Sequence, residues 1–230
     1  MSILTTSLRE HGLEVVPALP LEHARAILGH LSAHAQYDGH VKGRGVPATA
    51  ASAQTSWDMW AVLKAPHLLE YALPLTDVAR DYLEAEPLLY SVNAFTMHPS
   101  SGRLSPDTQE FHRDKDDSRF LALFIYLTDV WYPADGAHQF QLGTQHGADA
   151  GEVLTVLGEA GTAFLADTRG LHRGMRPATR ARTLLWVRWG VSDPPAGYRW
   201  DGTQPVAKAT LGDRYPSDPV LQRSIRLVAA

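Results

Sequence analysis

The feature that most constrains the fold is an uninterrupted apolar run, Phe120 to Leu127, which follows the polar stretch 111–114, Phe-His-Arg-Asp. The run has no alternation of apolar and polar residues, which predicts a strand covered on both faces. A second run, Leu184 to Trp189, and the alternating segment Leu88 to Met97 also indicate strands. These segments predict an all-β core with helices packed against it.

The stretch before the first run carries a metal-ligand pattern. In an extended chain His112 and Asp114 point to one face and Arg113 to the other. An imidazole and a carboxylate supply two thirds of the 2-His-1-carboxylate triad, which binds Fe(II) on one face and leaves the opposite face open. The third ligand must come from a distant segment. His172 is the best candidate, and His98 at the end of a predicted strand is its main rival.

The chain has 11 histidines, so a His-x-Asp pair alone is weak evidence, whereas the order of several motifs is more specific. That order resembles the phytanoyl-CoA dioxygenase-like family of Fe(II)/2-oxoglutarate oxygenases. The resemblance covers roughly residues 86–191 and is carried by His112-x-Asp114, Asp135-Gly136-Ala137-His138, Gly143-Thr144-Gln145-His146, Gly170-Leu171-His172-Arg173-Gly174 and Arg182. One departure is Thr144-Gln145, where the family usually has a single Ser. The family's histidine at the position of His146 is usually structural.

The resemblance implies a double-stranded β-helix, also called a jelly roll and related to the cupins, and an enzyme that uses Fe(II), 2-oxoglutarate and O2. It implies that His112, Asp114 and His172 hold the metal and that a small-molecule metabolite is oxidised with release of succinate and CO2. Because Asp114 fills the position that a halide would need, hydroxylation, desaturation, epimerisation or ring formation is favoured over halogenation.

Two further residues are expected to bind the co-substrate. Arg182 fits the far carboxylate of 2-oxoglutarate, because a guanidinium is planar, always charged and able to form two hydrogen bonds to a carboxylate. Its rivals are Arg176 and Arg180, expected in a solvated turn, and Arg188, which shares the face of Arg182. Asn93 lies in the middle of a predicted strand. The resemblance implies a contact with the 2-oxoglutarate carboxylates there, and a structural hydrogen bond is the alternative.

Composition excludes several other classes of protein. The chain of 230 residues is 44% hydrophobic with a net charge of -4, so it lacks the basic excess typical of nucleic-acid binding. It contains no cysteine, which rules out disulfides and thiolate metal sites. With no signal peptide or membrane-spanning run recognisable, we expect a cytoplasmic protein with no membrane or nucleic-acid partner. The oligomeric state stays open.

The rest of the chain is expected to form one domain over residues 1–230. A helix is predicted over Leu21–Ala35, further helices over 66–71 and 75–83 separated by Pro74, and short strands over 153–157 and 161–166. The N-terminal helices should pack on the larger sheet. Residues 37–54 and 99–110 should be loops beside the site, the second a candidate lid, and the tail after residue 191 should be irregular.

Two other functions share this fold. The first is a cupin-like metal enzyme that uses no 2-oxoglutarate and therefore needs no arginine to bind a carboxylate. The second is a non-catalytic jelly-roll binding module, in which we would expect a broken metal triad. The unbroken set of His112, Asp114 and His172 favours the oxygenase.

Overall fold

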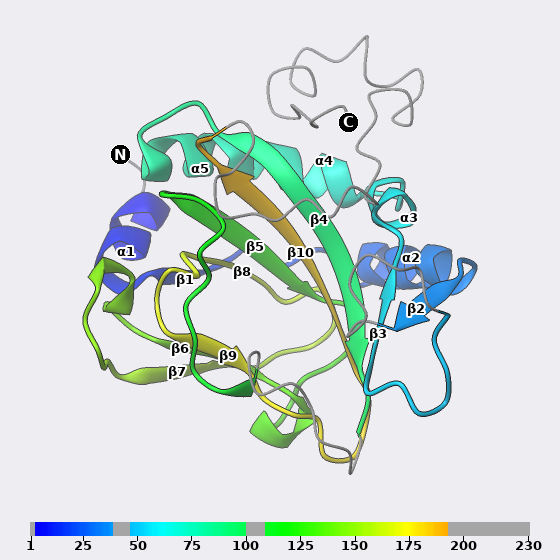
Figure 1. Ribbon diagram of the computed structural model, residues 1–230. Helices are drawn as coiled ribbons and strands as arrows, with labels where there is room; N and C mark the ends of the chain where they lie inside the picture. Colours follow the sequence, from blue (N-terminus) through cyan, green and yellow to red (C-terminus); the bar gives the residue numbers. More distant parts are fainter. Residues whose placement is uncertain (1–2, 39–46, 100–108, 193–230) are drawn as a thin grey trace, which may run out of the picture.

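Two β-sheets face each other in a jelly roll, and helices cover the outer side of the larger sheet (Figure 1). The computed structural model describes residues 3–38, 47–99 and 109–192. The larger sheet has the strand order β1-β8-β5-β10-β4-β3-β2, and the smaller has the order β7-β6-β9. The predicted all-β core with flanking helices is confirmed.

The elements have the following bounds. The strands are β1 (Leu13–Val16), β2 (Gln36–Asp38), β3 (Gln54–Trp57), β4 (Leu88–Met97), β5 (Phe120–Tyr126), β6 (His138–Gln141), β7 (Val153–Val156), β8 (Ala163–Ala166), β9 (His172–Gly174) and β10 (Arg182–Gly190). The helices are α1 (Ile3–His11), α2 (Leu21–Ser32), α3 (Met59–Leu63), α4 (Leu68–Ala72), α5 (Thr76–Leu83) and the short 3-10 turns η1 (Leu73–Leu75), η2 (Pro133–Asp135) and η3 (Thr144–His146).

Strand β5 lies inside the larger sheet, between β8 and β10, and is buried along its whole length. Leu121, Leu123 and Ile125 pack in an outer core shared with the helices. Phe124 and Tyr126 point the other way, into an inner core between the two sheets. The absence of alternation in the sequence therefore has the expected cause, which is apolar cover on both faces.

Strand β10 pairs with β4 on one side and β5 on the other, and its two faces differ in chemistry. Leu185, Val187 and Trp189 belong to the outer core under the helices. Leu184 and Trp186 belong to the inner core, so Arg182 and Arg188, on the same face by strand alternation, also point between the sheets. The residues on this inward face of β10 therefore lie at the candidate functional site.

The N-terminal helices pack on the larger sheet, as expected. Ile27 and Leu31 of α2 and Leu8 of α1 have no exposed surface and belong to the outer core. Truncating a side chain buried in this way typically costs about 2–5 kcal/mol. None of the described helices is long and apolar enough to cross a membrane.

The local structure differs from the predictions mainly at element boundaries and in elements that were not predicted. The described residues 47–53 of the predicted loop form neither helix nor strand. At the two ends of that loop, β2 and β3 pair with each other and extend the sheet beyond β4. The two helices predicted on either side of Pro74 are α4 and α5, and Pro74 lies between them in the 3-10 turn η1. Helix α1 and strands β1 and β6 were not predicted. Most of the proposed lid, residues 100–108, and the tail from 193 lie outside the described residues, so assignment of the whole chain to one domain stays a prediction.

Candidate metal centre

His112, Asp114 and His172 are brought together by the backbone. The backbone N–H groups of His112 and His172 each donate to the other's carbonyl at 3.0 Å, which forms an isolated bridge beside β9. The backbone N–H of Asp114 donates to the Thr168 carbonyl at 2.8 Å. These bonds fix the segment before β5 against the segment around β9.

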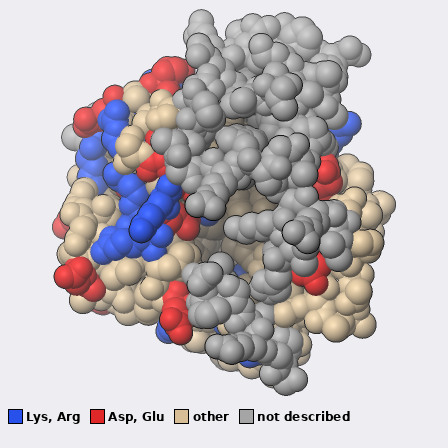
Figure 2. Space-filling model, viewed as in Figure 1, with Lys and Arg blue, Asp and Glu red and all other residues tan. Residues whose placement is uncertain are grey.

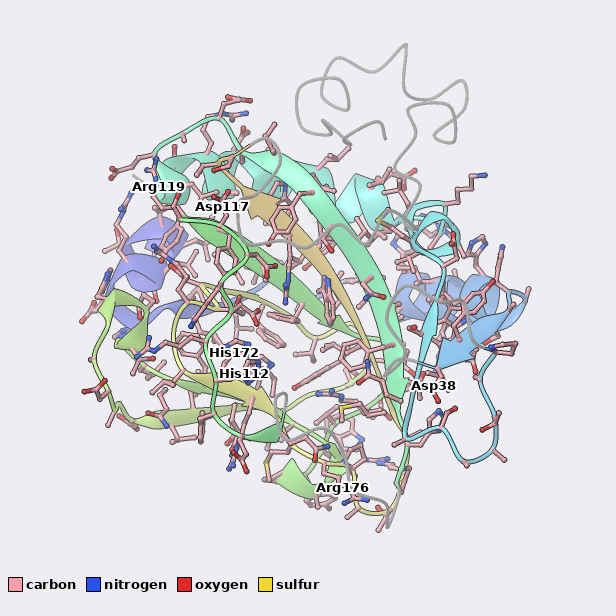
Figure 3. All side chains as sticks on the ribbon, viewed as in Figure 1. Asp38, His112, Asp117, Arg119, His172 and Arg176 are labelled. Carbon is pink, nitrogen blue, oxygen red and sulfur yellow. The ribbon has the colours of Figure 1, made fainter. Side chains whose placement is uncertain are left out.

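The side chains of these three residues converge. One ligand atom from each lies within 4.8 Å of the others. The Nε2 atoms of His112 and His172 are each 3.7 Å from an oxygen of Asp114, and their ring centroids are 4.3 Å apart. Figure 3 shows His112 and His172 side by side between the sheets, and Figure 2 shows the surface hollowed near the centre of the same view. The arrangement matches a facial triad.

Both histidines are oriented by their second ring nitrogen. Nδ1 of His112 lies 2.9 Å from the Glu110 carbonyl, and Nδ1 of His172 lies 3.0 Å from the Gly170 carbonyl. A carbonyl can only accept, so each Nδ1 carries the proton and each Nε2 keeps a lone pair for a metal. Fe(II) prefers such neutral imidazoles together with a carboxylate.

Arg188 holds the carboxylate of this triad. Its Nη2 atom donates to Oδ2 of Asp114 at 2.9 Å, and its Nη1 atom donates to Asp116, which also accepts from the Tyr90 hydroxyl at 2.8 Å. Burial by itself would raise the pKa of Asp114, but Arg188 and the neighbouring histidines outweigh it, and the pKa lies below its ordinary value. Burial lowers the pKa of His172 to about 4. At neutral pH the carboxylate is therefore ionised and His172 is neutral, as metal binding requires.

Arg182 occupies the interior at the other end of β10. It is 1% exposed, donates from Nη1 to the Gly136 carbonyl at 2.5 Å and from Nη2 to the Met97 sulfur at 3.1 Å, and leaves Nε without a partner. No carboxylate of the described residues forms an ion pair with it. Burial lowers the pKa of this guanidinium. A buried cation without a counter-ion lowers the stability of the fold. Such a cation is expected where a site binds an anionic ligand.

His138 was noted in the sequence only as part of a motif, but it lies inside the site. Its ring stacks on His172 with centroids 5.7 Å apart. It is 3% exposed, and its Nε2 atom has no hydrogen-bond partner. Burial, followed by the nearby His172 and Arg182, lowers its pKa well below the ordinary value, so the imidazole is neutral. The sequence signal that could have placed it is its spacing of two residues from Phe140, because residues two apart in a strand point to the same face and Phe140 points inward.

The rival histidines and arginines have other partners. His98 lies beside β3, where its Nε2 is 3.1 Å from the Thr55 hydroxyl, and it takes no part in the metal cluster. His146 contacts the Arg9 carbonyl at 2.8 Å, in agreement with a structural role. Arg180 forms an ion pair with Asp135 at 2.6 Å.

Two other candidates are placed as follows. Asn93 is half-buried on β4 and lies opposite Trp186 in the strand register, on the face toward the inner core, so its contact with the co-substrate stays a prediction. Asp167 accepts hydrogen bonds from the Tyr82 hydroxyl and from Arg169. These contacts fix the chain just after the end of β8.

Comparison with solved structures agrees with this fold. HygX from Streptomyces hygroscopicus, solved with nickel and 2-oxoglutarate, is 15% identical with a TM-score of 0.61 over 84% of this chain and 87% of that one. The non-haem 2-oxoglutarate-dependent epimerase SnoN, from nogalamycin biosynthesis, is 15% identical with a TM-score of 0.60 over 86% and 95% of the two chains. The non-haem monooxygenase ThoJ, solved with nickel, is 19% identical with a TM-score of 0.58 over 96% of each chain.

At these identities the likeness defines the class of fold: a jelly roll of the kind found in non-haem metal enzymes that use 2-oxoglutarate. No protein-family model matches the sequence. No curated protein matches it either.

Proposed function

We propose that this protein is a non-haem Fe(II)- and 2-oxoglutarate-dependent dioxygenase, similar to the phytanoyl-CoA dioxygenase-like family, that oxidises a small-molecule metabolite and releases succinate and CO2. One observation carries the proposal. The His112, Asp114 and His172 cluster shares its barrel with Arg182, a buried cation that has no carboxylate partner among the described residues.

The donor set suits Fe(II). The Nε2 atoms of the two histidines and the Asp114 carboxylate would hold Fe(II) as a 2-His-1-carboxylate facial triad. The iron, with 2-oxoglutarate and O2 bound, supplies the oxidation, while the protein supplies geometry, charge and a dry interior. Arg188 keeps the Asp114 carboxylate oriented, and backbone carbonyls fix the ring planes of the two histidines.

The remaining residues of the site would bind 2-oxoglutarate and keep water away from the metal. Arg182 would hold the far carboxylate of 2-oxoglutarate with a fork of two donors, and Asn93 would contact the same ligand. Phe95, Phe124 and Trp186 line the inner core beside the cluster, which keeps bulk water away from a reactive oxidant.

The reaction is proposed to be hydroxylation, desaturation, epimerisation or ring formation. Asp114 is present and held by Arg188, so a halide has no place in the triad. Proteins of the same fold include an epimerase, SnoN, and a carbocyclase, SnoK. HygX was solved with the small molecule hygromycin B, which supports a small metabolite as the substrate here.

The test is a turnover assay with purified protein, Fe(II), ascorbate and 2-oxoglutarate against a metabolite panel, with succinate as the readout. We expect slow succinate formation without substrate and faster formation with it, while mass spectrometry under labelled O2 detects oxygen gained or hydrogen lost. His172→Ala is the matched control. Succinate that never exceeds the no-enzyme level, with metal demonstrably bound, would favour a cupin-like enzyme without 2-oxoglutarate or a binding module.

A further inference from the structure

His138 lies between the metal cluster and Arg182. In the pairing of β6 with β9, Phe140 is opposite His172 and His138 is opposite Gly174, so His138 is one inward position further along the ladder. The next step along the chain leads to Gly136, whose carbonyl accepts from Arg182 at 2.5 Å. A ligand that reaches from the metal cluster to Arg182 must therefore pass His138.

Gly174 leaves room for the guanidinium of Arg182. A Cβ atom at this position would lie 3.3 Å from Nη2 of Arg182, so a side chain there would crowd the guanidinium. His138 is the residue opposite this glycine. The imidazole and the guanidinium thus border the same part of the interior.

The imidazole of His138 is held in place by its neighbours, but one of its ring nitrogens has no hydrogen-bond partner. The backbone N–H of His138 donates to the Tyr126 hydroxyl at 2.9 Å, and its ring packs against Phe124 and Phe164 with centroids 4.9 and 5.1 Å away. Its Nε2 atom is buried and has no partner. Buried polar atoms in proteins are nearly always hydrogen-bonded, so an unpaired one in a site indicates a missing ligand.

We propose that His138 is a further binding residue for the co-substrate, whose Nε2–H donates a hydrogen bond to the 2-oxoglutarate carboxylate held by Arg182. The inference rests on the proposed function, because it takes 2-oxoglutarate to be the ligand. It adds a second donor beside the guanidinium of Arg182. Two donors of different kinds on one carboxylate fix its orientation as well as its charge.

The test is calorimetric titration of 2-oxoglutarate into the Mn(II)-loaded protein, which needs no turnover. His138→Leu removes the donor and keeps an apolar side chain of similar size, and we expect the Kd for 2-oxoglutarate to rise roughly ten- to a hundredfold. Mn(II) affinity should stay within about twofold. His138→Gln, which places an amide N–H near the position of Nε2, should recover most of the affinity, and His98→Gln is the control outside the site.

Thermal unfolding separates binding from a structural role. Because Nε2 has no partner in the free protein, His138→Leu should not lower the Tm without 2-oxoglutarate. A lowered Tm, with no recovery in His138→Gln, would overturn the inference in favour of a structural histidine. If the wild type binds 2-oxoglutarate and His138→Leu binds it equally well, this inference alone is wrong. If the wild type with Mn(II) bound does not bind 2-oxoglutarate, the proposed function fails, and this inference fails with it.

Discussion

Replacing Arg182 with methionine should make the ligand-free protein more stable. The guanidinium is 1% exposed and has no carboxylate partner among the described residues, and a buried charge without a partner costs several kcal/mol. Arg182→Met removes that charge at similar length, but it leaves the Gly136 carbonyl without its donor, at a cost of about 1–3 kcal/mol. The net expectation is a gain of roughly 1–3 kcal/mol. For a chain of this length that raises the Tm by about 2–12 °C.

The same substitution should remove stabilisation by 2-oxoglutarate. At a hundred times its Kd, a ligand stabilises the folded wild type by about 2.7 kcal/mol. Loss of one partner of a buried charge pair costs about 3–5 kcal/mol, which is roughly two to four orders of magnitude in Kd or KM. The variant should therefore be the more stable protein without 2-oxoglutarate, whereas added 2-oxoglutarate should stabilise the wild type much more than the variant.

Thermal unfolding of Mn(II)-loaded protein, with and without 2-oxoglutarate, measures both effects. Arg180→Met is the matched control, because Arg180 is paired with Asp135 and its side chain is 44% exposed, and it should keep the response to 2-oxoglutarate. Metal affinity should be nearly unchanged in both variants. The reasoning is refuted if Arg182→Met lowers the Tm without ligand and keeps the full response. An unaltered KM in this variant, with Arg188→Ala defective instead, would identify Arg188 as the co-substrate residue.

Three further predictions concern the metal cluster. Replacing His112, Asp114 or His172 by Ala should lower Fe(II) or Mn(II) affinity at least about tenfold with the fold intact. Undiminished calorimetric binding in His172→Ala would move the third-ligand role to another histidine. Arg188→Met, which frees the Asp114 carboxylate, should lower metal affinity by roughly tenfold, with partial recovery in Arg188→Lys, and equal affinity in all three proteins would contradict a positioning role. The pKa of His172 is lowered to about 4 in the metal-free fold, so the unfolded chain takes up its proton first as the pH falls. The contribution of His172 to metal-free stability should be nearly full at pH 7 and should fall by about 2 kcal/mol between pH 7 and 5. Denaturant titrations should show a smaller loss in His172→Gln.

The elements that were predicted correctly have strong local signals. Strands β4, β5 and β10 are long apolar or alternating runs, and their burial follows from that pattern alone. The positions of His112, Asp114, His172 and Arg182 came from motif order, and the structure places the first three together. The sequence itself contains the types of the candidate ligands and the order of their motifs, which is why these residues could be predicted.

The elements that were missed depend on distant partners. Strand β3 is only Gln54–Trp57 and becomes a strand because the end of β4 offers free backbone groups. The ion pair between Arg188 and Asp114 joins residues 74 positions apart, so no local pattern reveals it. The unpaired Nε2 atom of His138 is likewise a property of packing. Sequence periodicity predicts which face a residue takes, but not which group meets it there.

The two inward arginines of β10 show how one strand serves both halves of the site. Arg188 meets Asp114 and Asp116, so its charge is compensated within the protein and it holds the Asp114 carboxylate in place. Arg182 meets a carbonyl and a thioether, neither of which carries a charge, so its charge is left for a ligand. Arg188 cannot take over the role of Arg182 without releasing the Asp114 carboxylate. Loss of 2-oxoglutarate binding in Arg182→Met should therefore not be recovered by the second arginine, although both point into the same interior.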